Sequence, residues 1–515
     1  MQQREQWATR LGFVLAASGS AIGLGNIWRF PYIAYENGGG AFLIPYFFAL
    51  LTAGIPILLL EFGIGRSQGG SAPLSLRRLS SRFEWLGWWQ VMISFVIAVY
   101  YVAVIVWALS YFFFSFNLKW GSDTGGFLFG EYLRVPDNVV SDSGWVIGGI
   151  QWHIFLPLVV VWAAAFYVLF NGVQKGIERA NKILMPILVV VMILFVIRAV
   201  TLDNAAAGLN HLFTPQFSKI FPGGGNPEWY KVWMAAYGQV FFSLSIAFAI
   251  MVTYSSYLDK KTDVNNSGFI MAFANSGFEF LAAIGVFAAI GFMAGVTGSD
   301  VSEVAAAGVG LAFVVFPQII NEFPFLNGFF GALFFLSLVL AGFTSFISIL
   351  EVIIAAVMDK LRLTRKKAVS WVIGVCFVVS IAFSTGAGII FLDIVDHFIN
   401  AYGIVVAGFL EVLLLGWFSK KLNQIRQENN LVSDFSVGYW WNIMIKFVTP
   451  VVLLFMTILN LISEFSANYE GYPTHAIVTF GWVMVLLSIV IAFVLAYAIR
   501  WKDESPAVAN REVSG

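Results

Sequence analysis

The sequence predicts an all-α membrane protein, and its composition, its recurring apolar segments and its distribution of basic residues all favour that class. Hydrophobic residues make up 59% of the 515 positions, charged residues only 11%, and the mean hydropathy is +0.83. Such a composition lies outside the range of water-soluble domains. The formal net charge is zero, so the charge balance gives no indication of a nucleic-acid partner.

Apolar segments long enough to cross roughly 30 Å of hydrocarbon as a helix recur twelve times along the chain. We expect twelve transmembrane helices, at 11–36, 41–65, 85–117, 152–172, 180–201, 229–258, 264–297, 326–358, 366–384, 389–418, 438–463 and 474–500. They divide the chain into an N-terminal segment (1–10), helices 1–5 (11–201), a loop (202–228), helices 6–10 (229–418), helices 11 and 12 (438–502) and a polar tail (503–515).

The basic residues indicate how these helices are oriented. All but six of the 29 Lys and Arg fall in segments that a count of twelve helices places on the same side as residue 1. Cytoplasmic connections are enriched in Lys and Arg, so we expect both termini in the cytoplasm and the loop 202–228 outside the cell. The first ten residues are too short to form a cleavable signal. The sequence thus predicts a multi-pass protein of the cell membrane, embedded in the lipid bilayer.

Two of the predicted helices contain features that weaken a membrane helix near its middle. The first has three glycines in GSAIGLGN (19–26), and the sixth has two hydroxyls in FFSLS (241–245). The bilayer core has no water to satisfy freed N–H and C=O groups, so breaks are tolerated only where protein or a cavity surrounds them. Broken membrane helices are therefore candidates for a binding site. Because helices 1 and 6 are five apart, two five-helix units would have opposite orientations in the membrane.

The segment GSAIGLGNIWRFPYIAYENGGGAFLIPYF, at 19–47, closely resembles the signature of the neurotransmitter:sodium symporter family. The resemblance continues through REQWATR (4–10), GQVFFSLSIAF in the sixth helix and AGFTSFISILE in the eighth. It implies a LeuT-like fold of twelve helices, with a 5+5 inverted repeat and breaks in helices 1 and 6. It also implies a symporter, not an enzyme, that uses sodium to import an amino acid by alternating access. The oligomeric state, including a homodimer, stays open.

One sodium site, named here the helix-8 site, is predicted around Ala341, Thr344 and Ser345. Their spacing of three and four residues places them on one face of a helix. On spacing alone, the hydroxyls are as well explained by hydrogen bonds to their own helix. The resemblance favours a sodium ion, which would also contact the carbonyls of Gly19 and Ile22.

A second sodium site, named here the amide site, is implied by the resemblance for Asn26, Ser243 and Asn275 with the carbonyl of Ala21. In the family, the substrate carboxylate completes this coordination shell. A buried amide considered by itself is more often a hydrogen-bonding link between helices.

The substrate is predicted to be a neutral amino acid with a hydrophobic or small aliphatic side chain. Freed N–H groups near Leu24 and Gly25, with the phenol of Tyr101, suit a carboxylate. The ammonium would be accepted by the carbonyls of Ala21, Phe242 and Ser243 and the hydroxyl of Ser245. By correspondence with the family, the pocket for the substrate side chain is formed by Ser20, Ile97, Phe242, Phe248, Ser345 and Ile349. It contains no formal charge, so a charged substrate side chain would be buried without a partner.

Glu279 lies four residues after Asn275, on the same face of the seventh helix. Acidic residues within membrane helices are costly and commonly functional. Chloride-dependent members of the family have serine at this position, so the resemblance implies that the Glu279 carboxylate replaces chloride. A structural hydrogen bond between helices is the alternative. The resemblance also implies that Glu61, in the second helix, braces the broken sixth helix.

Two pairs of opposite charges correspond to the gates of the family. Arg29 with Asp396 would close the outer end, and Arg4 with Asp359 the inner end, where Trp7 and Tyr257 also match gate residues. Static salt bridges or arginines that extend to the interface are the alternative. Glu351 has no role that the sequence assigns. The competing function is an amino-acid sensor or channel without transport activity, although the aromatic pair Tyr101 and Phe242 favours occlusion over an open pore.

Overall fold

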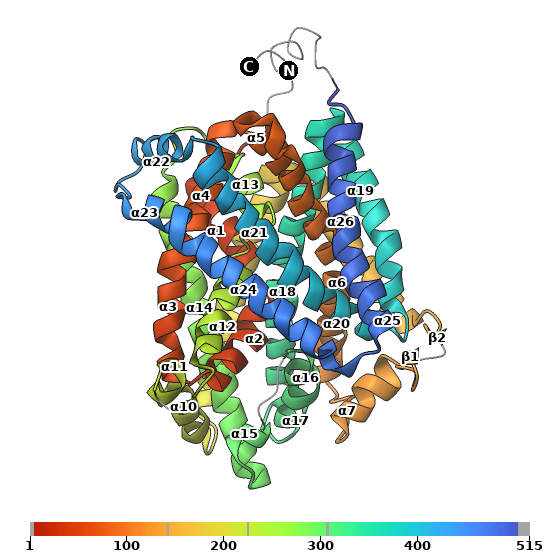
Figure 1. Ribbon diagram of the computed structural model, residues 1–515. Helices are drawn as coiled ribbons and strands as arrows, with labels where there is room; N and C mark the ends of the chain where they lie inside the picture. Colours follow the sequence, from red (N-terminus) through yellow and green to blue (C-terminus); the bar gives the residue numbers. More distant parts are fainter. Residues whose placement is uncertain (1–4, 142–143, 224–225, 305–307, 503–515) are drawn as a thin grey trace, which may run out of the picture.

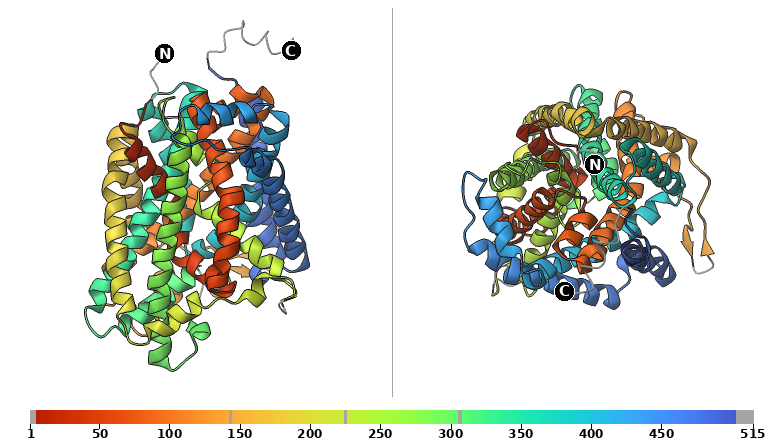
Figure 2. Two further views of the ribbon diagram at one scale, coloured as in Figure 1. Left: turned by 90° about the vertical axis from the view of Figure 1, so that its left-hand side faces the viewer. Right: turned by 90° about the horizontal axis from the view of Figure 1, so that it is seen from above.

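The computed structural model describes residues 5–141, 144–223, 226–304 and 308–502, and these residues are helical almost throughout. The longest uninterrupted helices run side by side along the bundle (Figures 1 and 2). They are α6 (Glu84–Ser115), α8 (Trp152–Phe170), α9 (Arg179–Val200), α14 (Val264–Thr297), α18 (Asn327–Leu361) and α19 (Arg365–Ser380). Helix α18 packs against α6, α9 and α1 (Arg10–Ala21).

Four further spans consist of consecutive helical segments joined by short 3-10 or π-helical turns. The first is η1 (Gly40–Phe42), α3 (Leu43–Ala49), η2 (Leu50–Gly54) and α4 (Ile55–Gln68). The second is α20 (Gly388–Phe398), η8 (Ile399–Ile404), α21 (Val405–Leu413) and η9 (Leu414–Phe418). The third is α23 (Trp440–Ile443), η10 (Met444–Val448), α24 (Thr449–Ser466) and η11 (Tyr469–Gly471). The fourth is α25 (Thr474–Ala476), η12 (Ile477–Trp482), α26 (Val483–Phe493) and η13 (Val494–Ala498).

Shorter elements cover the two ends of the bundle (Figure 1). At one end, named here the α5 end, lie α5 (Ala72–Leu79) and α22 (Leu422–Asn430). The opposite end carries α7 (Thr124–Gly126), α10 (Ala205–Phe213), α11 (Phe217–Ile220), α15 (Val301–Val304), α16 (Gly308–Gly310), α17 (Phe316–Asn321) and the β1–β2 hairpin (Val140–Ser141, Gly144–Trp145). The remaining short segments are η3 (Ser81–Phe83), η4 (Phe127–Tyr132), η5 (Val173–Glu178), η6 (Leu311–Val315) and η7 (Ile381–Ser384). The predicted loop 202–228 thus contains two short helices.

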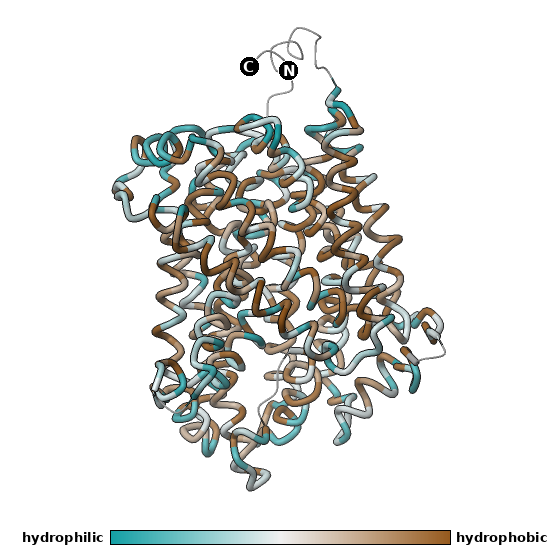
Figure 3. The backbone as a smooth tube through the Cα atoms, viewed as in Figure 1, coloured by the Kyte–Doolittle hydropathy of each residue, from teal (hydrophilic) through white to brown (hydrophobic). Residues whose placement is uncertain are grey.

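The distribution of apolar residues fits a bilayer. Apolar residues predominate along the middle of the bundle, and hydrophilic residues gather at both ends (Figure 3). Within the described residues, ten helices are long and apolar enough to cross a membrane, and one bent pair brings the number to eleven. The predicted sixth helix is not among them because it is divided into α12 (Trp229–Ser243) and α13 (Ile250–Ser255).

The predicted break in the first helix is confirmed. Helix α1 ends at Ala21, α2 (Leu24–Glu36) begins at Leu24, and the two are bent by 55°. Ile22 and Gly23 between them have extended backbones. The Gly23 N–H donates to Asn26 Oδ1 at 2.8 Å, so it does not continue the helical hydrogen-bond pattern. The carbonyls at the end of α1 are therefore left without their helical partners.

The break in the sixth helix has a different local cause. Ser245, Ala247 and Ala249 have φ values of +52°, +72° and +69°, in the left-handed region that is unfavourable for residues with a Cβ. Glu61, fully buried in α4, accepts the Ala247 N–H at 2.6 Å. This confirms the expectation that Glu61 braces the broken helix. A buried carboxylate thus stabilises a backbone conformation that residues 244–249 would not favour alone.

Candidate ion and substrate site

Hydrogen bonds to the Ser20 carbonyl join the two helix breaks. This carbonyl accepts the hydroxyl of Ser245 at 2.9 Å and that of Ser345 at 3.0 Å. The side chain of Ser20 also accepts from Ser348 at 2.7 Å. These bonds join the end of α1, the break in the sixth helix and the middle of α18. All four serines are less than one-tenth exposed.

The structure brings together the three side chains predicted for the amide site. The Asn26 Nδ2 donates to Asn275 Oδ1 at 2.9 Å and to Ser243 Oγ at 3.3 Å, and Asn275 donates to Ser243. Their exposure is 2% or less, and they come from α2, α12 and α14. Amide and hydroxyl oxygens are hard, neutral donors, which suit a monovalent cation whose charge is not fully cancelled by the site.

At the predicted helix-8 site, the two hydroxyls make different hydrogen bonds. Thr344 donates to its own helix, to the carbonyls of Leu340 at 3.0 Å and Ala341 at 3.1 Å. Ser345 instead reaches across to α1. The donated proton leaves lone pairs on the Thr344 oxygen, so the hydroxyl keeps its capacity to ligate a cation. Gly19 packs against α9, where an added Cβ would lie 2.3 Å from Asn181 Oδ1.

The residues predicted to bind an amino-acid backbone surround the first break. The Leu24 N–H points to the Tyr101 hydroxyl at 3.4 Å. A Cβ added to Gly23 would lie 3.2 Å from that hydroxyl and 3.6 Å from Ser345 Oγ. A Cβ on Gly25 would lie 2.3 Å from the Phe242 ring, so only glycine permits this close approach.

The apolar residues of the predicted pocket lie on elements that already contribute to the site. Ile97 is one turn before Tyr101 on α6, and Ile349 is one turn after Ser345 on α18, so each shares a face with a site residue. Both isoleucines and Phe248 are less than one-tenth exposed. The Phe248 carbonyl accepts the hydroxyl of Ser94 at 2.8 Å, which fixes the end of the break.

Glu279 lies beside the amide site and is fully buried. It accepts hydrogen bonds from Gln239 Nε2 at 2.7 Å and from the Tyr46 hydroxyl, which also contacts Ser276 at 2.8 Å. No ion pair with Glu279 is present among the described residues. The donors around Glu279 are thus neutral and form a polar cradle for one negative charge.

The predicted outer contact is not formed in this structure. The Arg29 guanidinium lies 4.7 Å from the centroid of the Phe242 ring. Asp396 accepts instead from the Tyr100 hydroxyl at 2.6 Å and from Asn400 Nδ2 at 2.9 Å. Between the described atoms of Arg29 and Asp396 there is no ion pair, so the two partners of the predicted gate are separate.

The predicted inner end, by contrast, is held by direct contacts. Arg4 lies outside the described residues, so its predicted pair with Asp359 is not tested; Asp359 accepts the Ser71 N–H at 2.7 Å. The Trp7 indole donates to the Tyr254 carbonyl at 2.8 Å, and the Trp7 N–H to the Tyr257 carbonyl at 3.1 Å.

Sequence reasoning missed the ion-pair network next to this contact. The Tyr257 hydroxyl donates to Glu351 at 2.6 Å, Glu351 pairs with Arg365 at 2.6 Å, and Arg365 also pairs with Glu5 at 3.0 Å. Glu351, for which the sequence suggested no role, is therefore the centre of a cluster that joins the turn after α13 to α18 and α19. An acidic residue within an apolar helix was the signal that pointed to a buried partner.

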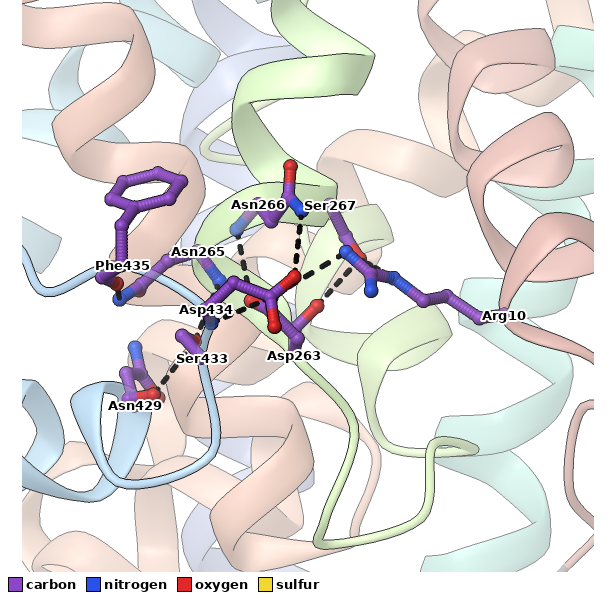
Figure 4. A network of polar contacts seen from close by, with 9 residues as sticks. All are labelled: Arg10, Asp263, Asn265, Asn266, Ser267, Asn429, Ser433, Asp434 and Phe435. Atoms are coloured by element: carbon purple, nitrogen blue, oxygen red, sulfur yellow. Dashed lines mark hydrogen bonds and ion pairs between the residues drawn. The ribbon is translucent and has the colours of Figure 1, made fainter.

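A second inner network connects the start of α1 to α14 and to the segment after α22 (Figure 4). Asp263 caps α14 by accepting the Asn266 N–H at 3.0 Å, and it pairs with Arg10 at 3.6 Å. It also accepts the Asp434 N–H at 3.0 Å. Burial raises the pKa of Asp263, but these hydrogen bonds and the Arg10 charge outweigh burial and lower the pKa below its usual value.

Two opposed helix breaks inside a membrane bundle, with buried amides and hydroxyls converging on the freed backbone, define the class of secondary transporters. The model of the sodium:neurotransmitter symporter family matches residues 4–129 and 122–503. The chain therefore belongs to the sodium:neurotransmitter symporter family, as its sequence resemblance predicts.

Individual relatives agree with this assignment. The chain is 40% identical over 493 residues to an uncharacterized sodium-dependent transporter of Methanocaldococcus jannaschii, covering 96% of this chain and 97% of that protein. It is 30% identical over 535 residues to the human sodium- and chloride-dependent GABA transporter 2, covering 95% and 85%. The crystal structure of MhsT in complex with L-phenylalanine superposes with a TM-score of 0.72 at 31% identity, covering 88% of this chain and 99% of MhsT.

Proposed function

We propose that this protein imports a neutral amino acid with an apolar side chain, coupled to sodium and independent of chloride. The observation that carries the proposal is the convergence of Asn26, Ser243 and Asn275 at the two helix breaks, with the Glu279 carboxylate beside them. Neutral ion ligands, a fixed negative charge and free backbone groups occur together at one buried place.

Two sodium ions would move with the substrate. The amide site supplies side-chain oxygens of Asn26, Ser243 and Asn275, with the Ala21 carbonyl nearby in sequence. The helix-8 site supplies Thr344 and Ser345, and its expected backbone ligands lie in the last turn of α1 and at Ile22. The carbonyls there lack helical partners, which favours a cation between α1 and α18.

A zwitterion fits the remaining polar groups. Its carboxylate would lie at the start of α2, next to the Tyr101 hydroxyl, because the N-terminus of a helix attracts negative charge. Gly23 leaves room for that carboxylate. Ile97, Phe248 and Ile349 would surround an apolar side chain. L-phenylalanine bound to MhsT is an amino acid of this kind.

Chloride independence would follow from Glu279. The human GABA transporter 2 is described as chloride-dependent, whereas a resident carboxylate at this position supplies the negative charge that compensates for sodium. Because the surrounding donors Tyr46 and Gln239 are neutral, they are equally suited to a carboxylate or to a halide ion.

Alternating access would use the two ends of the bundle. We propose twelve membrane helices in a 5+5 inverted repeat, with the α5 end in the cytoplasm, where the basic segments gather. The contacts at Trp7 and Glu351 close the cytoplasmic end, and the separated Arg29 and Asp396 correspond to a state that faces outward. Transport requires the outer pair to form and the inner contacts to break.

Uptake by the purified protein in proteoliposomes tests the proposal. Labelled L-leucine and L-phenylalanine are expected to accumulate with a sodium gradient and not with a potassium or proton gradient alone. Replacing chloride by gluconate should leave uptake unchanged. In the Glu279→Ser variant uptake should require chloride, whereas Glu303→Ser, which removes an exposed carboxylate, should behave as the unaltered protein. Sodium-independent uptake, or chloride dependence of the unaltered protein, would overturn the assignment.

A further inference from the structure

A basic cavity lies at the α5 end, between the start of α6 and the end of the last membrane span. Its volume is about 290 Å³, and its lining includes three arginines, Arg77, Arg82 and Arg500. Among the described residues of its lining, Glu84 is the only acidic one. Neither the amide site nor the helix-8 site involves these residues.

Glu84 is already engaged by other groups. It accepts from Lys360 Nζ at 2.6 Å, in an ion pair whose two side chains are 2% and 6% exposed, and from the Trp501 indole at 3.0 Å. Arg77 also lies 3.6 Å from Glu84. One carboxylate thus faces two cations, so the described residues of the lining supply no further negative charge to balance Arg82 and Arg500.

Arg82 and Arg500 are the groups available to a ligand. Both are exposed, and in the part of the chain that the structure describes neither makes a hydrogen bond or an ion pair. They come from different elements, η3 and the segment after η13. Two guanidinium groups that line one cavity match a phosphate group, whose oxygens can accept two parallel N–H bonds from a guanidinium.

The surface next to the cavity is apolar. Along α26 and η13, Phe493, Val494 and Tyr497 are 41%, 48% and 60% exposed, and Phe493 stacks on Trp85 with 4.9 Å between ring centroids. This strip belongs to the apolar membrane span Thr474–Ala498, whose mean hydropathy reaches 2.7. A ligand with an anionic head and hydrocarbon chains would thus fit both surfaces, with its head at the arginines and its chains along the apolar strip.

We propose that this cavity binds the phosphate headgroup of an anionic phospholipid from the cytoplasmic leaflet, with its acyl chains along α26 and η13. The assignment to the cytoplasmic leaflet rests on the orientation given under the proposed function, whereas the position of the site in the structure does not. A free phosphate ion would use the arginines alone, whereas the adjacent apolar strip favours a lipid. Basic pockets at the cytoplasmic ends of membrane helices commonly bind such headgroups.

Lipid binding to the full-length protein in a neutral detergent tests this site. The apparent affinity for phosphatidylglycerol, from native mass spectrometry or the shift in unfolding temperature, should exceed that for phosphatidylcholine. In the Arg82→Gln/Arg500→Gln variant it should weaken about 30-fold, as expected for two cations at a lipid surface. The control Lys420→Gln/Arg426→Gln removes two cations beside and within α22, elsewhere at the same end, and should retain binding.

Other occupants give different results. Equal stabilisation by inorganic phosphate would identify a free-anion site, and full retention of phosphatidylglycerol binding in Arg82→Gln/Arg500→Gln would exclude the cavity; either result overturns the proposal. Removing residues 503–515 should leave lipid binding intact, whereas loss of binding would assign the site to that tail. Because these measurements involve no transport, they are independent of the uptake assay. The side of the membrane on which the cavity lies is tested separately, by labelling a Ser81→Cys variant with a reagent that does not cross the membrane.

Discussion

The inner and outer ends of the proposed transport path are held in different ways. At the inner end, Trp7, Glu351 and Asp263 each make direct hydrogen bonds or ion pairs between separate segments. At the outer end, Arg29 contacts an aromatic ring, and Asp396 of α20 accepts hydrogen bonds from Tyr100 of α6 and from Asn400, so neither charge is in an ion pair among the described residues. The difference teaches that ion pairs join the segments at the proposed inner end, whereas Arg29 and Asp396 at the proposed outer end remain available for a contact made later in the proposed cycle.

The largest effect is expected from breaking the buried Glu351–Arg365 pair. Glu351→Gln leaves the Arg365 guanidinium, whose side chain is 9% exposed, without its closest carboxylate. Losing one partner of a buried pair costs about 3 to 5 kcal/mol. We expect a lower unfolding temperature and greater labelling of an introduced cysteine at Ser256, close to Tyr257.

The double variant Glu351→Gln/Arg365→Gln serves as the control for that prediction. It removes both charges, so part of the lost stability should return. If the single variant is as stable as the unaltered protein, the inner end does not depend on this pair.

A smaller effect is expected at Trp7. Trp7→Phe keeps an aromatic ring against Tyr254, at a centroid distance of 5.2 Å in the unaltered protein, but removes the indole N–H donor. A single hydrogen bond of this kind contributes roughly 0.5 to 1.5 kcal/mol. Chemical denaturation should show a loss in that range, together with an inner end that opens more often. An unchanged free energy of unfolding would mean that packing alone holds Trp7.

The second inner network predicts a dependence on pH. Because the folded pKa of Asp263 is lowered, its contribution to stability is present above the unfolded pKa of about 3.9 and is lost as the pH falls through the folded pKa. Asp263→Asn should lower the unfolding temperature at pH 7, and the difference from the unaltered protein should shrink as the pH is lowered below 4. A difference in unfolding temperature that stays constant over this pH range would contradict a lowered pKa of Asp263.

The smallest effect on stability is expected at the outer end. Arg29→Gln removes a contact between a cation and the Phe242 ring. Such a contact is worth about 0.5 to 1 kcal/mol where the cation keeps contact with solvent, as the half-buried Arg29 does. Uptake should nevertheless fall sharply, since the contact with Asp396 can no longer form. An uptake rate equal to that of the unaltered protein would remove Arg29 from the gate.

Much of the candidate site was predictable because its residue types are unusual for a membrane helix. Asn26, Asn275 and Glu279 stood out within apolar segments, and the glycines around Gly23 indicated a break. The partner of another buried acidic residue, Glu351, could not be predicted from the sequence. Arg365 is close to the end of a helix, where a basic residue has an ordinary explanation, so nothing in the sequence linked it to Glu351.

The sequence by itself determined the membrane class, the places of the broken helices and the family, since these depend on local composition and on a long contiguous motif. Only the tertiary structure decided that Ser345 bonds across to Ser20 while Thr344 bonds to its own helix, and that Asp396 turns to Tyr100 in place of Arg29. The reason is physical: hydrogen bonds between helices depend on distances of a few ångströms between segments hundreds of residues apart. Periodicity along the chain does not contain that information.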